Sequence, residues 1–245
     1  MPVIFSSGYS GNFATWQLQI PYFIEQGYRV LTWDYRGHGD SDRVNYGLRI
    51  ARLAQDLHEL INNLQIKQYV LIGHSMGTMV DYAYTSLFNN DNILAIVSED
   101  QPPKMIPDEN WPYGRYDLNY ANLVQMAMDF PKTPLIRQPL TSEQKRRISH
   151  PTPKFDFNEN LPLLLDGMGQ NFLDVETHEQ MPHLFLAGAA SPLYDAKQAE
   201  AAKALQPNMA SQAVVFPDVG HIPHLEASES FNQVVVDFLD RVLAK

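Results

Sequence analysis

Short apolar runs alternate along this chain with segments whose apolar residues recur at helical spacing. Six runs, rich in β-branched residues, lie at residues 3–5, 29–33, 69–72, 93–97, 184–187 and 214–216. In segments 50–64 and 231–242 the apolar residues return every three or four positions, which predicts amphipathic helices. Strands that alternate with such helices are joined by right-handed crossovers and form a mostly parallel sheet. The pattern predicts an α/β fold with a mostly parallel six-stranded sheet flanked by helices.

One stretch interrupts this alternation. Residues 102–179 are rich in Pro, Met and aromatic residues, and their strand patterns are weak. Because loops of that length are uncommon in compact domains, we expect a helical insertion with helices near residues 118–130 and 161–172. It follows a strand end, where a cap would cover the carboxyl ends of the strands. We therefore expect residues 1–101 and 180–245 to form the core and 102–179 a cap or lid. Ordinary packing of these helices on the sheet is the alternative.

Composition restricts the possible partners. The chain has no cysteine, which excludes disulfides, thiolate metal sites and a cysteine nucleophile. A formal net charge of −10 disfavours binding to nucleic acid or anionic membrane surfaces, so we expect a small-molecule substrate. No apolar run approaches the roughly 20 residues of a membrane span, and the first residues lack the features of a signal peptide. We expect a cytoplasmic protein without a membrane span; composition leaves its oligomeric state open.

The pentapeptide Gly-His-Ser-Met-Gly at residues 73–77 stands between the predicted strand 69–72 and a helix predicted to begin near Thr78. A serine in such a strand–turn–helix setting is exposed in a strained conformation, and glycine fits the crowded flanking positions. The helix N-terminus beneath it presents free N–H groups and a positive dipole end to a developing oxyanion. Ser75 is therefore the predicted nucleophile.

With this motif the chain resembles the α/β-hydrolase superfamily over nearly its whole length. Residues 5–11 resemble the superfamily's oxyanion loop, with Ser7 where a histidine usually stands. Residues 34–41 resemble the loop after its fourth strand, and residues 220–226 resemble the loop that carries the catalytic histidine. The match begins at the superfamily's third strand. The resemblance thus implies a six-stranded core, with an edge strand that is either exposed or covered by an interface.

His221 is the predicted general base. It follows the last predicted strand in a short loop. An imidazole at that place can take the proton that Ser75 loses as its hydroxyl attacks a carbonyl carbon. His224 is the alternative base, and we expect it to pack beneath the site instead.

The resemblance also implies an oxyanion hole made of two backbone N–H groups, those of Tyr9 and Met76. Among the other histidines, we expect His38 and His74 to shape the pocket and His58 to have a structural role. No group of histidines and carboxylates has the sequence spacing of a metal site. We therefore expect neither a metal ion nor a cofactor.

The acid of the predicted triad departs from the superfamily's pattern. The superfamily commonly has an aspartate after the fifth of the strands predicted here, where this chain has Ser191. A serine hydroxyl cannot stabilise an imidazolium as a carboxylate does. Some members take the acid from the end of the preceding strand, which is followed here by Glu99 and Asp100, and the strand alignment favours Asp100. Asp195 and Asp218 are fallback candidates; without such a carboxylate a Ser–His dyad would remain.

Three functions are compatible with these residues. The first is hydrolysis of a carboxylic ester or related acyl substrate through an acyl-enzyme on Ser75. The second resembles the cofactor-independent dioxygenases of this fold, in which His221 and an aspartate would deprotonate a 3-hydroxy-4-quinolone-like substrate. The third is non-catalytic ligand binding on the same scaffold. The aromatic residues of the insertion favour an apolar acyl or aromatic substrate group, or else form the insertion's own core.

Overall fold

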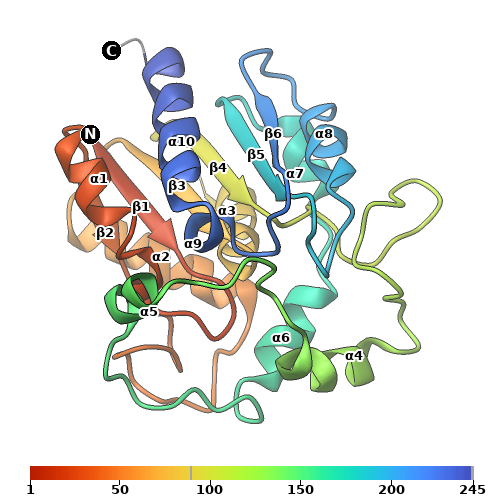
Figure 1. The fold of residues 1–245 in the computed structure, drawn as a ribbon. Coiled ribbons are helices and arrows are strands. Elements are labelled where there is room, and N and C mark those ends of the chain that lie inside the picture. The colour runs from red at the N-terminus through yellow and green to blue at the C-terminus, as the bar shows by residue number, and fades with distance from the viewer. Residues whose placement is uncertain (89, 244–245) are drawn as a thin grey trace.

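The computed structural model describes residues 1–88 and 90–243, in which six strands form one parallel sheet (Figure 1). Across the sheet the strands lie in the order β2-β1-β3-β4-β5-β6. The strands are β1 Pro2–Ser6, β2 Arg29–Thr32, β3 Tyr69–His74, β4 Ile93–Glu99, β5 His183–Gly188 and β6 Gln212–Phe216. Each of the six predicted runs is a strand, so the predicted α/β architecture is confirmed.

The register between β3 and β4 positions the candidate site. Both strands extend two residues beyond the apolar runs that predicted them, and His74 pairs with Glu99 at their ends. The residues that follow, Ser75 and Asp100, therefore leave the sheet side by side at its carboxyl edge.

Helices cover both faces of this sheet (Figure 1). The helices outside the predicted insertion are η1 Phe13–Trp16, α1 Ile20–Glu25, α2 Ile50–Asn63, α3 Met76–Leu87, α8 Lys197–Lys203, α9 Pro223–Glu226 and α10 Ser228–Val242. Because side chains alternate along a strand, Ile4 and Leu71 face α2 and α3, whereas Val3 and Val70 face α1 and α10. The two hydrophobic cores therefore lie on opposite sides of one sheet.

The amphipathic spacing that predicted α2 corresponds to one buried stripe. Ile50, Leu53, Ala54, Leu57 and Ile61 are all buried, and the helix packs along α3. An apolar stripe of this kind orients a helix against a core. The prediction of a helix in this segment is confirmed.

The segment 102–179 contains α4 Leu123–Asp129, η2 Phe130–Lys132, α5 Ser142–Ile148, α6 Leu161–Met168 and α7 Leu173–His178. In Figure 1, α4, α5 and α6 lie beyond the carboxyl ends of the strands, whereas α7 packs against α3. This placement fits a cap at the carboxyl edge. The division into core and cap stays a prediction.

Two helices expected in this segment are shorter than predicted. The first begins only at Leu123, because the Asn122 side chain donates to the Asp117 carbonyl at 2.7 Å and accepts from the Asn119 N–H at 2.8 Å. Such side-chain bonds to the backbone compete with helix formation. The second ends at Met168, before a glycine.

Helix α5 was missed by the apolar pattern because none of its residues is buried. Its start is a capping box, in which Thr141 and Gln144 each bond the other's backbone N–H. A polar surface helix of this kind has no apolar stripe to reveal it.

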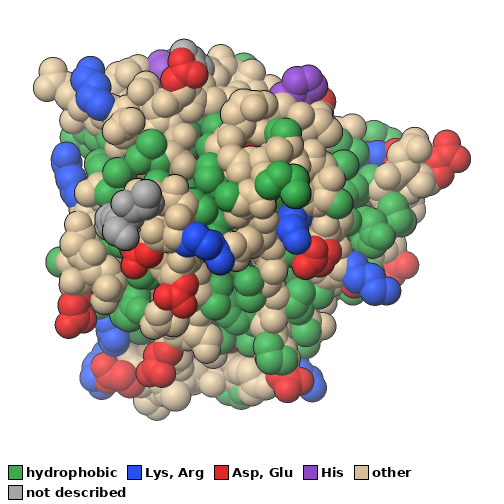
Figure 2. Space-filling model, turned by 90° about the horizontal axis from the view of Figure 1, so that it is seen from above, with side chains coloured by type: hydrophobic (Ala, Val, Ile, Leu, Met, Phe, Trp, Pro, Cys, Tyr) green, Lys and Arg blue, Asp and Glu red, His purple; other side chains and the backbone are tan. Residues whose placement is uncertain are grey.

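Within the described residues, no helix is both long and apolar enough to cross a membrane. The molecule viewed from above, toward the amino ends of the strands, carries acidic and basic side chains interspersed with apolar ones (Figure 2). The candidate site lies at the other end of the sheet, where the strands terminate.

Candidate active site

Ser75 occupies the sharp turn between β3 and α3. Its backbone has φ 52° and ψ −121°, a combination that residues with a side chain rarely adopt. A Cβ on Gly73 would lie 2.5 Å from a backbone nitrogen of α3, and one on Gly77 would lie 2.1 Å from a carbonyl oxygen of β1. Glycine is therefore required at both positions. Helix α3 begins at Met76, earlier than the predicted Thr78, because Ser75 itself is the N-cap residue.

A line of hydrogen bonds joins three side chains that are far apart in the sequence. Ser75 Oγ lies 2.9 Å from His221 Nε2, and His221 Nδ1 lies 2.6 Å from Asp100 Oδ2. Ser75 is 8% exposed, and His221 and Asp100 are each 1% exposed. The buried carboxylate can fix the imidazole tautomer, which leaves Nε2 to accept the serine proton. This is the arrangement that nucleophilic catalysis by a serine requires.

Asp100 is anchored from β5 as well. Its Oδ1 accepts the backbone N–H of Gly188 at 3.0 Å, and its Oδ2 accepts the hydroxyl of Ser191 at 2.6 Å. Asp100 has φ 45°, a strained value that these contacts hold in place. Ser191 stands where the superfamily commonly has its aspartate, and here it donates to the carboxylate on the neighbouring strand. No local sequence pattern predicts this contact.

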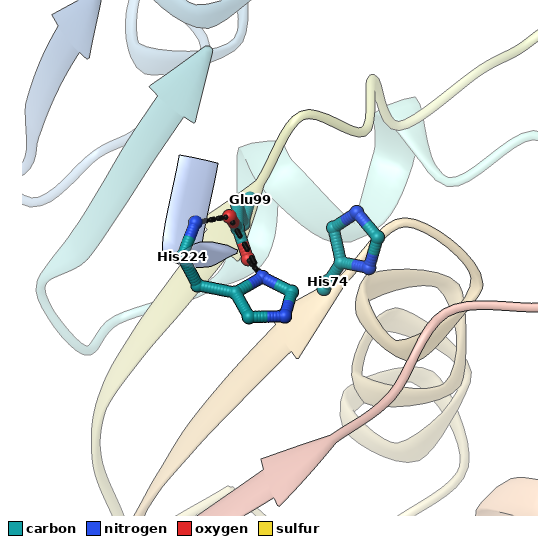
Figure 3. Close-up of side chains that lie close together, drawn as sticks. All are labelled: His74, Glu99 and His224. Carbon is teal, nitrogen blue, oxygen red and sulfur yellow. Dashed lines mark hydrogen bonds and ion pairs between the residues drawn. The ribbon is translucent and has the colours of Figure 1, made fainter. Parts of the chain in front are cut away.

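Glu99 points to a different histidine. Its carboxylate accepts the His224 backbone N–H at 2.6 Å and lies 2.8 Å from His224 Nδ1 (Figure 3). The His224 ring stacks on Trp16 with centroids 4.1 Å apart. Glu99 and His224 are fully buried and form a second carboxylate–imidazole pair beneath the first. The structure therefore brings Asp100, not Glu99, to His221.

His74 lies between the two pairs. Its Nε2 is 2.9 Å from the carbonyl oxygen of His221, and its ring centroid is 5.0 Å from that of His224. Burial is the main reason that the pKa of His74 falls well below its usual value, and the neighbouring His221 and His224 add to the effect. His74 is therefore neutral, and its Nε2–H donates a hydrogen bond to the His221 carbonyl oxygen.

Two groups of buried side chains have ligand atoms within 4.8 Å of one another. They are His74, Glu99 and His224 (Figure 3), and Glu176, Glu179 and His183. In the first, Glu99 already binds His224; in the second, Glu179 lies 2.9 Å from His183 Nδ1. The first cluster joins distant segments, since His74 pairs with Glu99 across β3 and β4 and His224 comes from α9, whereas the second lies within eight consecutive residues at the junction of α7 and β5.

Tyr9 and Met76, whose backbone N–H groups are the predicted oxyanion hole, line a cavity together with Ser75. Within the described residues neither N–H donates a hydrogen bond, so both are free for a ligand atom. Gly8 allows the loop to approach, since a Cβ there would lie 2.7 Å from His74 Nδ1. The Tyr9 ring packs edge-on against Phe130, and burial raises the pKa of its hydroxyl, which stays protonated.

Two cavities meet at Ser75. The larger has a volume of about 190 Å³ and the smaller about 20 Å³. Tyr9, Ser75 and Phe130 line both of them. His74, expected to shape the pocket, lines the larger cavity. His38 lines neither; it is buried against Tyr35 and Phe155, and burial lowers its pKa to about 4.

The loop that carries His221 is held by hydrogen bonds to residues 135–138. The His221 N–H donates to the Leu135 carbonyl at 2.8 Å. The Glu226 carboxylate accepts the N–H groups of Gly220, Arg137 and Gln138 at 3.1, 2.8 and 2.7 Å. These bonds tie the histidine loop to the segment between η2 and α5. This role of Glu226 leaves no sequence pattern, because its donors are backbone groups.

The remaining candidates lie away from these contacts. The Asp195 carboxylate accepts the Lys197 N–H at the start of α8 at 2.9 Å, and the Asp218 carbonyl accepts the Gln138 side chain at 3.1 Å. His58 stacks on Phe88 with centroids 3.9 Å apart, as a structural histidine does. Neither aspartate has a hydrogen bond to His221 in the described structure.

Comparison with known proteins places this fold and sequence in a family. A non-heme chloroperoxidase of Kitasatospora aureofaciens is 32% identical over 114 residues, and a bifunctional esterase/perhydrolase of Acinetobacter calcoaceticus is 32% identical over 115. Each match covers 46% of this chain and 42% of the relative, so the chain spans less than half the length of these curated relatives. An esterase structure from Exiguobacterium antarcticum superposes with a TM-score of 0.85, at 19% identity, over 98% of this chain and 92% of that one. The family model of the alpha/beta hydrolase fold matches residues 1–133, and the chain therefore belongs to the α/β-hydrolase family.

Proposed function

We propose that the chain hydrolyses carboxylic esters through an acyl-enzyme on Ser75, with His221 as general base and Asp100 as the acid. One observation carries the proposal: Ser75 Oγ, the His221 ring and Asp100 Oδ2 form a continuous hydrogen-bonded line at 2.9 and 2.6 Å beside an apolar cavity. Relatives named as esterase, perhydrolase and chloroperoxidase are compatible with a hydrolase.

In the first half of the reaction Ser75 Oγ attacks the ester carbonyl carbon. His221 Nε2 takes the hydroxyl proton, and the buried Asp100 carboxylate stabilises the imidazolium that results. As the tetrahedral intermediate collapses, the same Nε2 proton passes to the leaving alcohol. The ester C–O bond breaks, and the acyl group remains on Ser75.

The carbonyl oxygen becomes negatively charged in this intermediate. We assign its stabilisation to the free backbone N–H groups of Tyr9 and Met76, together with the N-terminus of α3. Preorganised donors of this kind contribute about 3–4 kcal/mol each in serine hydrolysis. A water activated by His221 then releases the carboxylic acid and restores Ser75.

Removal of the Ser75 hydroxyl tests this function. Ser75→Ala should abolish hydrolysis of p-nitrophenyl acetate and labelling by an ethoxy fluorophosphonate probe. Ser86→Ala is the matched control, since it removes an exposed serine from the same helix, and it should retain both signals. A native protein that neither hydrolyses esters nor reacts with the probe would contradict the proposal.

One structural feature also favours cofactor-free dioxygenase chemistry as a second candidate. Asp100 stands at the end of β4, where those enzymes of the same fold carry their aspartate, and it bonds His221 at 2.6 Å. This His–Asp pair is able to deprotonate a 3-hydroxy-4-quinolone. Oxygen uptake with that substrate that survives Ser75→Ala and disappears in His221→Ala would support this candidate and exclude an acyl-enzyme.

A further inference from the structure

The two cavities at Ser75 differ in both size and lining. The larger, about 190 Å³, is bounded by His221, Ile222 and Leu225. The smaller, about 20 Å³, lies on the side of Met76 and is closed by Leu164 and other apolar side chains. We call them the large chamber and the small chamber.

The chemistry of ester cleavage decides which half of a substrate enters each chamber. This step rests on the proposed function. The leaving oxygen has to receive its proton from His221 Nε2, so the alcohol half lies on the side of His221. His221 lines the large chamber and is absent from the lining of the small one, as far as the described residues show. The substituent on the acyl carbon therefore points into the small chamber.

The volumes set the size of each half. A cavity of about 150 Å³ lined by aliphatic and aromatic side chains is known to hold benzene, so the large chamber accommodates an aromatic ring. A single water-sized sphere needs about 10–15 Å³, so the small chamber holds one or two carbon atoms beyond the carbonyl. The geometry favours a bulky alcohol and a short acyl group.

The residues that line the two chambers also restrict the charge that a substrate can carry. Among the described residues that line the two chambers, none is Lys, Arg, Asp or Glu. A charged group on either half would be buried without a partner, at a cost of several kcal/mol. From size, lining and the position of His221, we propose that the substrates are neutral acetyl or propionyl esters of an aromatic or similarly sized apolar alcohol. Water supplies the hydroxyl and the proton, and the products are a short carboxylic acid and the free alcohol.

Packing between α6 and α3 keeps the small chamber short. Gly167 of α6 faces Met79 of α3, and a Cβ on Gly167 would lie only 3.1 Å from Met79 Sδ. The Met79 side chain is therefore already in tight contact with α6 at this point. Leu164, which is 8% exposed, fills the space one turn earlier on the same helix. Its side chain limits the length of the acyl group.

Acyl length is tested with p-nitrophenyl acetate, propionate, butyrate and hexanoate, which share one leaving group. In the native protein kcat/KM should fall about tenfold or more from propionate to butyrate, as expected for a methylene that does not fit, and approach background with hexanoate. Leu164→Ala should raise kcat/KM for butyrate relative to acetate by about tenfold or more. Leu165→Ala is the matched control, because Leu165 is the next residue on the same helix and lines neither chamber. It should leave the ratio unchanged.

Met105 lines the same chamber from a different segment, so Met105→Ala should also enlarge it. This variant replaces Leu164→Ala in the experiment if circular dichroism shows that Leu164→Ala does not fold. The alcohol half is tested with benzyl acetate against ethyl acetate, whose alcohols are of similar acidity; benzyl acetate should have the higher kcat/KM.

The outcomes separate this inference from the proposed function. Native hydrolysis of hexanoate as fast as acetate, or an unchanged ratio in both enlarging variants, overturns the assignment of the small chamber and leaves ester hydrolysis standing. Ethyl acetate matching benzyl acetate overturns the assignment of the large chamber. Loss of all ester hydrolysis and of fluorophosphonate labelling in the native protein contradicts the proposed function itself.

Discussion

The hydroxyl of Ser191 donates to Asp100 Oδ2 at 2.6 Å, the same oxygen that lies 2.6 Å from His221 Nδ1. Ser191 stands on the loop after β5, where a triad aspartate is common in the family, whereas Asp100 stands after β4. The two positions are therefore in direct contact at one end of the sheet. A carboxylate at either place is close to the imidazole.

We expect Asp100→Asn to lower kcat for ester hydrolysis by several orders of magnitude. An asparagine cannot stabilise the imidazolium, and the same change in a serine protease triad costs about 10⁴ in kcat. Steady-state kinetics with p-nitrophenyl acetate measures the loss. Glu99→Gln is the companion variant, and its loss should be much smaller because Glu99 bonds His224. Full activity in Asp100→Asn with collapse in Glu99→Gln would reverse the assignment.

Ser191→Ala should destabilise the protein while leaving the triad side chains in place. A hydrogen bond to a charged group contributes about 1.5–3 kcal/mol, so the thermal midpoint should fall by roughly 3–12 °C for a chain of this size. Thermal unfolding followed by circular dichroism gives the shift. A midpoint equal to that of the native protein would show that the contact is not stabilising.

The contact between Ser191 and Asp100 also predicts that a second substitution can restore the kcat lost in Asp100→Asn. Ser191→Asp, introduced into Asp100→Asn, should restore part of the lost kcat, because the carboxylate then returns to the neighbourhood of His221. Ser191→Asn in the same background is the control, since it has the same size without the charge, and it should restore nothing. Equal activities in the two double variants would argue against a role for the charge.

Glu226→Gln should lower both stability and kcat. The carboxylate accepts four backbone N–H groups from two segments, those of Gly220, Ile222, Arg137 and Gln138, and an amide nitrogen in its place would face some of these donors. A hydrogen bond to a charged group contributes about 1.5–3 kcal/mol, and at these partly exposed donors the loss per bond is at the lower end of that range. Because the loop carries His221, kcat should fall more than KM changes. Glu229→Gln, an exposed position on α10, should leave both quantities unchanged; similar effects in the two variants would indicate a nonspecific loss of charge.

Acidification should destabilise the protein through His38. Burial lowers its pKa from 6.5 to about 4, so between these values the unfolded state binds a proton that the folded state does not. The free energy of unfolding therefore falls as pH drops from 6.5 toward 4, by about 3 kcal/mol from this residue. Urea unfolding at pH 7 and pH 4.5 measures the difference, which should shrink in His38→Gln. A difference of the same size in that variant would mean that His38 is not the group that titrates.

The sheet and the elbow could be predicted because their signals are local. Each strand contains a short run of apolar residues, and the turn at Ser75 requires glycines at fixed positions, two residues before and two after. The helix near residues 118–130 was overextended because Asn119 and Asn122 form turn contacts that apolar spacing does not register. The polar α5 left no apolar pattern at all.

The choice between the two candidate acids, by contrast, could not be made from local sequence patterns. Glu99 and Asp100 are adjacent carboxylates, and the sequence alone ranks them only by strand alignment. Their side chains point to His224 and His221 because a strand alternates its faces and Asp100 then turns at φ 45°. Ser191 and Glu226 were missed because their partners are a carboxylate and backbone groups of distant segments.

Three bonds between the histidine loop and residues 135–138 are made by main-chain atoms of that segment, and the Gln138 side chain adds one to the Asp218 carbonyl. Side chains there other than Gln138 are therefore free to change over evolutionary time without disturbing His221, whereas inserting or deleting one residue would shift every donor and acceptor out of place. Homologues that keep this link should vary in the identity of these residues but not in their number. Directed evolution of the pocket wall at Leu135 can exploit the same freedom, by substituting the side chain that borders the large chamber while the backbone contact is preserved.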